Sequence, residues 1–402
     1  MQHAATSLLA AALLSFAAPG CGGDPYEESA NAFDRSKLHR IDITVDAHYI
    51  PELETNLDAR VPCTFTFDGE AVDEAGIRQK GGLNSITGID VIEGGSFKPK
   101  PSFSVRLDEF DENGDIHGLR RIILNSSVQD PSFFHQHFGS DMAHKAGLPA
   151  ARTAHSIVTL NGTTFGLYVI TEAIDTDFLG RVFGAENDRG NLYEGRQVDF
   201  TDVASIELKD EDDDRSRDDL KALADIVLST PPAEIAAAVR PRLDLDQFIT
   251  AFAFETAINH FDGFAYNRNN YYLYNNPADD RFVFIPHGMD QIVRIPADKD
   301  DTLGDELEAL LPQLIVQNPE LKAAYDAELA RIANDLWDLP AIFAEIDRVA
   351  AVVGTAQVTG VRGEGDIAAF NSYVNFWRDD LTKRRDTLLS ATSAEAPAGP
   401  LD

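Results

Sequence analysis

The chain has 402 residues, of which 34 are Lys or Arg and 67 are Asp or Glu, so its formal net charge at pH 7 is −33. This charge argues against DNA, RNA and anionic membrane surfaces as partners, because few cations are present to neutralise phosphates. With 44% hydrophobic and 25% charged residues, the chain can bury a sizeable core and is not disordered as a whole. Its two cysteines exclude a disulfide scaffold and a cysteine-based zinc module.

The first residues predict export. An apolar stretch covers residues 8–18, which is too short to span a bilayer and fits the core of a signal peptide. Cys21 follows a glycine and precedes two glycines and an aspartate, as in the cleavage and acylation site of bacterial lipoproteins. We therefore expect a signal peptide over 1–20, a lipid anchor to the cell envelope at Cys21 and a polar tether over 21–37. The alternative is an ordinary secretory signal, in which Cys21 is incidental.

Residues 38–175 predict a strand-rich lobe. Apolar and β-branched residues alternate with period two in HRIDITVDAHYI and VPCTFTFDGEAV, and KPSFSVRL and RRIILNS continue this pattern into a mostly antiparallel sheet. A four-residue apolar repeat that stops at Gly147 predicts a helix over 132–146. The pair Asn161–Gly162 predicts the turn of a β-hairpin.

Residues 176–390 predict a helical lobe that contains one strand pair, at 270–274 and 281–285. The final residues, 391–402, are expected to be disordered. The fold class is therefore α+β with two lobes, and a cleft between two lobes commonly binds ligands. The predicted helices cover 218–228, 232–239, 245–260, 305–314, 320–336 and 366–389.

Two aspartates flank the strand pair of the helical lobe. Asp262 follows the end of a predicted helix, and Asp290 follows the second strand. Because the strand pair folds back on itself, we expect the two carboxylates to converge although 28 residues separate them. Two carboxylates suit magnesium and phosphate chemistry, since Mg²⁺ prefers oxygen ligands and a second carboxylate can orient a hydroxyl nucleophile.

Asn267 adds an amide to this pair. It lies five residues after Asp262, the same offset as the Asp and Asn of a protein-kinase catalytic loop. Asp and Asn also form turns and helix caps, so this spacing alone leaves open that Asp262 is only a cap residue at a helix end.

A glycine-containing segment in the strand-rich lobe could bind phosphates. Gly81 and Gly82 follow a predicted strand, and a loop of this kind can present backbone N–H groups to phosphate oxygens. Lys100 immediately precedes the next strand and could neutralise the phosphates. The alternative is an ordinary turn followed by a strand-edge lysine.

Together these blocks resemble the CotH kinase family over about residues 38–389, and they occur in the family's order. The matching stretches are GIRQKGG, KPSFSVRLDEF, LNSSVQDPSFFHQHFGSDMAHKAGLPAARTA, VTLNGTTFGLYVITEAID, HFDGFAYNRNNYYLYNNP, RFVFIPHGMDQI and NFWRDDLTKRRDTLL.

The resemblance implies an atypical protein-kinase-like fold that transfers phosphate from ATP with Mg²⁺. By position, Asp262 matches the catalytic-loop aspartate. In the same block, Asn267 is a second expected catalytic residue and Asn270 an expected nucleotide contact. Asp290 matches the metal-holding aspartate, and Asn267 is the second expected metal ligand. The implied acceptors are Ser or Thr hydroxyls of an unidentified surface or secreted protein.

The resemblance also implies the nucleotide contacts. Lys100 matches the lysine that binds the nucleotide phosphates. Gly81 and Gly82 begin the loop that would cover these phosphates. Glu172 would lie at the junction between the lobes, where the adenine edge is held.

Two alternatives remain open at this stage. The family block before the metal aspartate often contains a further acidic residue where this chain has Gly288, so a kinase fold without catalysis, acting in surface assembly or binding, is the first. The second is a metal-dependent hydrolase built from His260, Asp262, His287 and Asp290, a donor set that suits zinc, iron or manganese.

Overall fold

The structure is a computed structural model. It describes residues 27–81, 101–127, 129–130, 132–209, 215–293, 301–304, 306–354 and 367–394. The predicted signal peptide and the predicted acylation site at Cys21 lie outside these residues. In the described part of the chain, no helix is both long enough and apolar enough to cross a bilayer.

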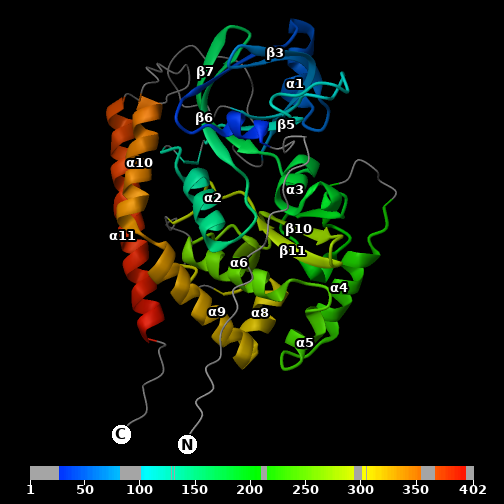
Figure 1. The fold of residues 1–402 in the computed structure, drawn as a ribbon, viewed down its shortest axis with the longest axis vertical. Coiled ribbons are helices and arrows are strands. Elements are labelled where there is room, and N and C mark those ends of the chain that lie inside the picture. Colours follow the sequence, from blue (N-terminus) through cyan, green and yellow to red (C-terminus); the bar gives the residue numbers. More distant parts are fainter. Residues whose placement is uncertain are drawn as a thin grey trace, which may run out of the picture.

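The first half of the chain forms a closed barrel, drawn at the top of Figure 1. Its strand order is β1-β2-β3-β4-β5-β7-β6, and every neighbouring pair is antiparallel except β1 and β6. That parallel pair, in which Ile41 lies opposite Val158, closes the sheet on itself. The prediction of a mostly antiparallel sheet is therefore confirmed. The closure of this sheet into a barrel was not predicted. The strands are β1 (His39–Thr44), β2 (Val61–Phe67), β3 (Glu70–Lys80), β4 (Ser102–Arg106), β5 (Arg121–Asn125), β6 (Thr153–Leu160) and β7 (Thr163–Glu172).

Alternating side chains fill the barrel. In β2 every second residue is buried, as the period-two pattern predicts for a strand with one face in a core. The barrel core includes Phe65, Phe103, Ile122 and Tyr168, all essentially without solvent exposure. Consequently the opposite faces of β3, β4 and β5 point out of the barrel and are available for other contacts.

Part of the predicted tether belongs to the folded structure. The 3₁₀ helix η1 (Glu28–Phe33) buries Ala32 and Phe33 against the barrel, and the guanidinium of Arg152 lies 4.5 Å from the Phe33 ring. The prediction of a free tether over 21–37 is therefore wrong from Glu28 onward, because a large apolar side chain there finds a place in the core.

A second, four-stranded sheet lies below the barrel, in the order β11-β10-β8-β9. The predicted strand pair is present as β10 (Tyr271–Asn276) and β11 (Arg281–Pro286), and β10 also pairs with β8 (Leu192–Gly195). β9 (Glu207–Leu208) forms the edge. The chain crosses from the barrel to this part between β7 and α3 (Thr176–Phe183). The predicted α+β class is confirmed.

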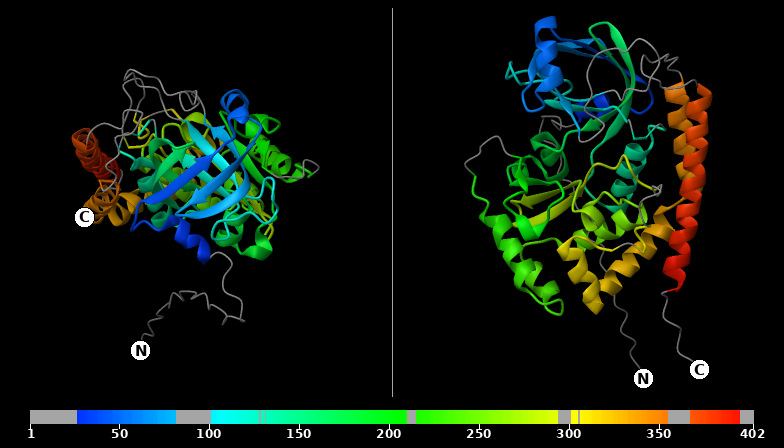
Figure 2. Two further views of the ribbon diagram at one scale, coloured as in Figure 1. Left: turned by 90° about the horizontal axis from the view of Figure 1, so that it is seen from above. Right: turned by 180° about the vertical axis from the view of Figure 1, so that it is seen from behind.

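Helices surround this sheet and build most of the lower part (Figures 1 and 2). The predicted helices are present with shifted ends, and α1, α3, α7 and α10 are additional. Asn318 caps one of them: its side chain accepts hydrogen bonds from the backbone N–H groups of Glu320 and Leu321, and Pro319 takes the first helical position. The remaining helices are α1 (Ile50–Thr55), α2 (His135–Ala146), α4 (Asp218–Ser229), α5 (Ile235–Val239), α6 (Leu245–Ala257), α7 (Phe264–Asn267), α8 (Leu310–Gln317), α9 (Pro319–Arg331), α10 (Leu339–Gly354) and α11 (Ile367–Ala394), with short helices η2 (Ala47–Tyr49), η3 (Ala185–Asn187), η4 (Phe200–Asp202) and the π-helix η5 (Ile332–Leu336).

α10 and α11 run side by side along one edge of the molecule, and α11 continues beyond α10 to the level of α9 (Figures 1 and 2). α11 continues to Ala394, so residues 391–394 are helical rather than part of a disordered tail. Arg384 attaches α11 to the end of α6. Its buried guanidinium donates to the carbonyl oxygens of Thr256 and Ala257 and pairs with Asp301.

Arg384 should therefore carry measurable stability. Replacing it with Met removes the donor of the Ala257 carbonyl, one of the donors of the Thr256 carbonyl and the cation that pairs with Asp301, and we expect the free energy of unfolding to fall by about 3 kcal/mol. Lys383→Met, at the exposed neighbouring position on α11, is the matched control and should cost about 0.5 kcal/mol or less. Urea denaturation of the three proteins measures both values. Equal stability of the two variants would contradict the assigned role of Arg384.

Candidate active site

The loop that follows α6 surrounds Asp262 with amides. The carboxylate of Asp262 accepts hydrogen bonds from the side-chain NH₂ groups of three asparagines: Asn267, Asn269 at 3.2 Å and Asn270 at 2.8 Å. Asn270 donates a further bond of 2.9 Å to the backbone carbonyl of Asp262. The side chain of Asp262 is therefore held in one position by its own loop, and it is not merely a helix cap.

Buried groups support this loop from below. Both carboxylate oxygens of Glu255, on α6, accept bonds of 3.0 Å from the first backbone N–H groups of α7, those of Phe264 and Ala265. Burial raises the pKa of Glu255 to about 7, although these two hydrogen bonds oppose the shift. This contact fixes the turn of chain that carries Asn267, because α7 is only four residues long.

A second set of contacts joins this loop to the segment that follows β11. The backbone N–H of His287 donates to the carbonyl of Asn270 at 3.1 Å, and His260 Nε2 donates to the carbonyl of Gly288 at 3.3 Å. Gly288 has φ +63°, and a Cβ placed on it would lie 2.4 Å from Oδ1 of Asn270. The close approach of the two segments therefore depends on glycine at position 288.

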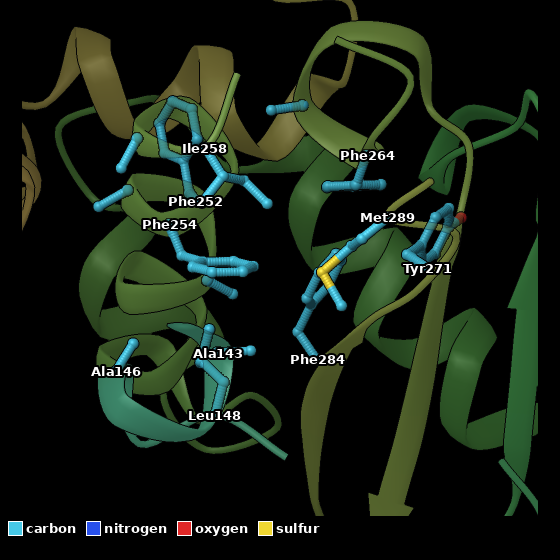
Figure 3. Close-up of a cluster of buried hydrophobic side chains, with 14 of the residues drawn as sticks. Ala143, Ala146, Leu148, Phe252, Phe254, Ile258, Phe264, Tyr271, Phe284 and Met289 are labelled. Carbon is cyan, nitrogen blue, oxygen red and sulfur yellow. The ribbon is translucent and has the colours of Figure 1, made fainter. Parts of the chain in front are cut away.

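Helix α2 holds the same segment from the other side. His135 Nδ1 donates to the carbonyl of Asp290 at 2.8 Å, and Gln136 Oε1 accepts from the backbone N–H of Met289 at 3.0 Å. Gly139 provides the space for Met289, since a Cβ at position 139 would lie 2.8 Å from Met289 Cβ. Figure 3 shows the Met289 side chain in the buried cluster beside Phe284. The backbone at Asp290 is thus fixed by a buried side chain and two hydrogen bonds.

The charge of Asp262 acts on Asp290. Burial raises the pKa of Asp290 to about 6, and the negative charges of Asp130 and Asp262 add to the shift although His135 opposes it. The hydrogen bonds described above join the segments that carry the two aspartates. Two carboxylates beside amide oxygens form the oxygen-rich donor set that Mg²⁺ prefers, and a cation would relieve their mutual repulsion. The donors that are present therefore fit a magnesium ion.

The structure describes some of the predicted nucleotide contacts and not others. Gly81, with φ +131°, directly follows β3, whereas Gly82 and Lys100 lie outside the described residues. Glu172 is the last residue of β7, and its buried carboxylate is bound by Arg152 and Arg181 at 2.6–3.1 Å. A carboxylate engaged in this way is not free to hold a nucleotide, so the contacts of Glu172 do not support its predicted role.

The structure adds Lys80 to the candidate residues. Lys80 ends β3, opposite Ser102 of β4, and its charge influences His287 of the lower part. Burial lowers the pKa of Lys80 although the charge of Glu194 opposes the shift. Among the described residues no hydrogen bond or ion pair engages its ammonium group. Its place directly before Gly81 is the sequence signal that could have identified it.

The hydrolase alternative does not fit this geometry. His260 is buried and uses Nε2 to bind the carbonyl of Gly288, and burial lowers its pKa. In the part of the chain that the structure describes, a different group brings three potential metal ligands together: His137, Asp141 and Glu345. That group joins α2 to α10, and Arg35 and Arg348 already neutralise its two carboxylates.

Comparison with known proteins agrees with the sequence blocks. The family model described as CotH kinase protein matches residues 77–388. The chain belongs to the CotH kinase family. The resemblance predicted from the sequence is thereby confirmed, and kinase family membership follows with it.

Individual relatives of this CotH kinase family member are more distant. Inner spore coat protein H of Bacillus subtilis (strain 168) is 26% identical over 183 residues, which are 43% of this chain and 50% of that protein. The chain thus matches about half the length of this curated relative. Among solved structures, the Helicobacter pylori proinflammatory kinase CtkA has 13% identity and a TM-score of 0.36, covering 76% of this chain and 94% of that one. HipA of Shewanella oneidensis MR-1, from a complex with HipB and operator DNA, has 12% identity and a TM-score of 0.38, covering 78% and 68%. Because both TM-scores are below 0.5, these two structures support no conclusion about this chain.

The contact between Gly288 and Asn270 leads to a stability prediction. Gly288→Asp introduces the acidic residue that the family often has, but its Cβ would overlap Asn270 and its φ would be left-handed, so we expect a loss of about 2–3 kcal/mol. Gly162→Asp is the matched control, because φ is +76° and nothing lies within 4 Å of a Cβ there. It should cost only about 1 kcal/mol. Chemical denaturation measures both.

A double variant separates the clash from the backbone strain. Asn270→Gly removes the atoms that a Cβ at position 288 would meet, so Gly288→Asp should cost less in that background than in the wild type. If the cost is the same in both backgrounds, the overlap between the two residues is not what requires glycine.

The shifted pKa of Asp290 predicts a pH-dependent stability. Because the folded-state pKa is raised, the folded protein binds more protons than the unfolded chain between about pH 4 and pH 6, so wild-type stability falls as the pH rises through this window. Asp290→Asn removes this cost. In metal-free buffer the variant should be more stable than the wild type by about 1–3 kcal/mol at pH 7.5, and the difference should shrink toward zero near pH 4. Denaturation at both pH values tests this, and a difference independent of pH would contradict it.

Proposed function

We propose that this CotH kinase family member is an active protein kinase that transfers the γ-phosphate of ATP to Ser or Thr hydroxyls of another protein, with Mg²⁺ as its metal. The observation that carries the proposal is the joining of the Asp262 loop to the Asp290 segment through His287, Gly288 and Asn270. Phosphoryl transfer needs mainly positioning and charge stabilisation, and rigidly held carboxylates supply the first.

In this proposal Asp262 is the catalytic base. Its three asparagine donors orient the carboxylate so that an oxygen can accept the proton of an incoming hydroxyl. Proton acceptance at this point makes the hydroxyl oxygen a better nucleophile as its bond to phosphorus forms.

Asp290 and Asn267 would hold the metal. A bound Mg²⁺ supplies neutralisation of the charge on the phosphate oxygens. The fixed backbone of Asp290, bound by His135 and anchored through Met289, supports this assignment, because a carboxylate that binds both metal and nucleotide must keep its place.

Lys80 is the described cation best placed to contact the nucleotide phosphates. It lies at the end of β3, directly before the glycine segment; its charge acts on His287, and the charge of Glu194 acts on it. The carboxylate of Glu194 is engaged by Lys209 at 2.9 Å and Arg196 at 3.2 Å. Among the described residues no carboxylate pairs with the ammonium of Lys80, and in this proposal it binds the nucleotide phosphates, with or without Lys100.

One reason for the alternative, a kinase fold without catalysis, is weakened. Gly288 suggested a missing metal ligand, but its contact with Asn270 gives the glycine a positive role in holding the active loop. We also propose, from the sequence alone, that the protein is exported and attached to the cell envelope through Cys21, where its substrate would be a surface or secreted protein.

Transfer of labelled phosphate tests the proposal. Purified wild type, Asp262→Asn, Lys80→Met and Lys37→Met are incubated with γ-labelled ATP, Mg²⁺ and extracts of envelope proteins. The wild type should label a protein, Asp262→Asn should reduce the rate by about 100-fold or more, and Lys80→Met should weaken ATP binding. Lys37 pairs with Asp68 on the barrel surface, so Lys37→Met is the matched control and should behave like the wild type.

Thermal unfolding with ATP separates the alternatives. If ATP and Mg²⁺ raise the melting temperature of the wild type but no phosphate moves, the binding-protein alternative is favoured. If ATP neither stabilises the protein nor labels any acceptor with any divalent metal, the kinase proposal is wrong.

A further inference from the structure

A polar cavity lies between the barrel and α3. Its volume is about 180 Å³, and its lining residues come from the end of β4, the start of β5, α3, the start of β8 and the segments on either side of β8 and β9. Neither Asp262 nor Asp290 lines it. The basic lining residues are Arg106, Arg120, Arg121, Arg189, Lys209 and Arg215, and the acidic ones are Asp108, Asp175, Asp177 and Asp188.

Among the described lining residues, six are basic and four are acidic. Most of these cations have an acidic partner: Arg106 pairs with Asp108 at 2.8 Å, Arg120 with Asp177, Arg189 with Asp188 at 3.3 Å, and Lys209 with Glu194 at 2.9 Å. The long-range field of a chain with charge −33 repels anions, so an anion needs a cation that lacks a close acidic partner.

Arg121 is the least neutralised of these cations. Its Nε is buried and has no hydrogen-bond partner among the described residues, and the carboxylate nearest to it, that of Asp175, lies 4.0 Å away. Burial raises the pKa of Asp175 to about 7, even though Arg121 opposes the shift. The other oxygen of Asp175 accepts hydrogen bonds from the backbone N–H groups of Asp177 and Phe178, so Arg121 has no close counter-ion among the described residues.

Neighbouring arginines add to the positive charge around Arg121. Arg106 and Arg121 lie directly opposite each other on β4 and β5, a placement that destabilises like charges. The same positive charges act on Arg60. Burial lowers its pKa to about 9, and the charges of Arg121, Arg78 and Arg106 lower it further. The outer face of β3, β4 and β5 thus concentrates positive charge beside the cavity.

We propose that this cavity binds a phosphate group, with Arg121 as its principal ligand and Arg106 as a further donor. A guanidinium can offer two parallel N–H groups to a phosphate, and a phosphate has enough oxygens to accept from several cations at once. The phosphate could belong to a nucleotide or to a separate phosphate ester. The proposal does not depend on the kinase function, because it concerns binding only.

Calorimetric titration with inorganic phosphate and pyrophosphate tests the site. The buffer contains EDTA, since without a divalent cation the carboxylates of Asp262 and Asp290 repel anions. The proteins are the folded chain as wild type, Arg121→Gln, Arg121→Lys and Arg240→Gln. Arg240 pairs with Asp246 on the surface and does not line the cavity, so Arg240→Gln is the matched control.

The wild type and Arg240→Gln should bind pyrophosphate equally, and Arg121→Gln should bind it about tenfold or more weakly. Arg121→Lys keeps the charge but loses the paired donors, so its affinity should be intermediate. This variant also keeps the test informative if Arg121→Gln does not fold. The proposal is overturned if the wild type binds neither anion, or if Arg121→Gln and Arg121→Lys bind pyrophosphate as tightly as Arg240→Gln.

Competition then identifies the source of the phosphate. If ATP displaces pyrophosphate and Arg121→Gln also weakens ATP binding, the cavity holds phosphates of the nucleotide. If ATP binds without displacing pyrophosphate, the cavity serves a separate phosphate ester. Either result supports a phosphate site. If the wild type binds pyrophosphate but transfers no phosphate in the labelling assay, the kinase proposal is contradicted and the phosphate-site proposal is not.

Discussion

One asparagine sets the distance between the two acidic segments of this protein. Asn270 donates to the carboxylate and carbonyl of Asp262, its own carbonyl accepts from His287, and its side chain packs against Gly288. Everything that the candidate active site can do depends on this contact, because it holds Asp262 near the segment that carries Asp290. Helix α2 completes the arrangement from the barrel side, so the site is assembled from parts of the chain that are more than a hundred residues apart.

Much of this site could be predicted from the sequence, since strand pairing is a local property. A hairpin returns the chain to its starting point, and Asp262 and Asp290 stand at the two ends of one. The reason for Gly288 could not be predicted, because its neighbour across the gap becomes known only once the backbone path is fixed. The same applies to Glu172, whose partners are Arg152, directly before β6, and Arg181 on α3.

The fold shows the same division. The hairpin at Asn161–Gly162 and the helices with clear apolar periodicity are present where the pattern indicates them, because their signals lie within a few residues. Closure of the barrel depends on β1 meeting β6 in parallel across more than a hundred residues, and no local pattern encodes that pairing. β8 and β9 have four and two residues, too few for a periodic signal. Lys80 is not among the residues that the sequence predicts, because its influence on His287 of the lower part becomes known only from the fold.

The binding of Mn²⁺, a paramagnetic substitute for Mg²⁺, tests the convergence of the two acidic segments most directly. Electron paramagnetic resonance measures it for the wild type, Asp262→Asn, Asp290→Asn and the surface variant Asp280→Asn, with a non-hydrolysable ATP analogue present. If Asp290 and the Asp262 loop share a cation, the wild type and Asp280→Asn bind Mn²⁺ with equal affinity, and the other two variants bind it more weakly. Equal affinity in all four proteins would contradict the account.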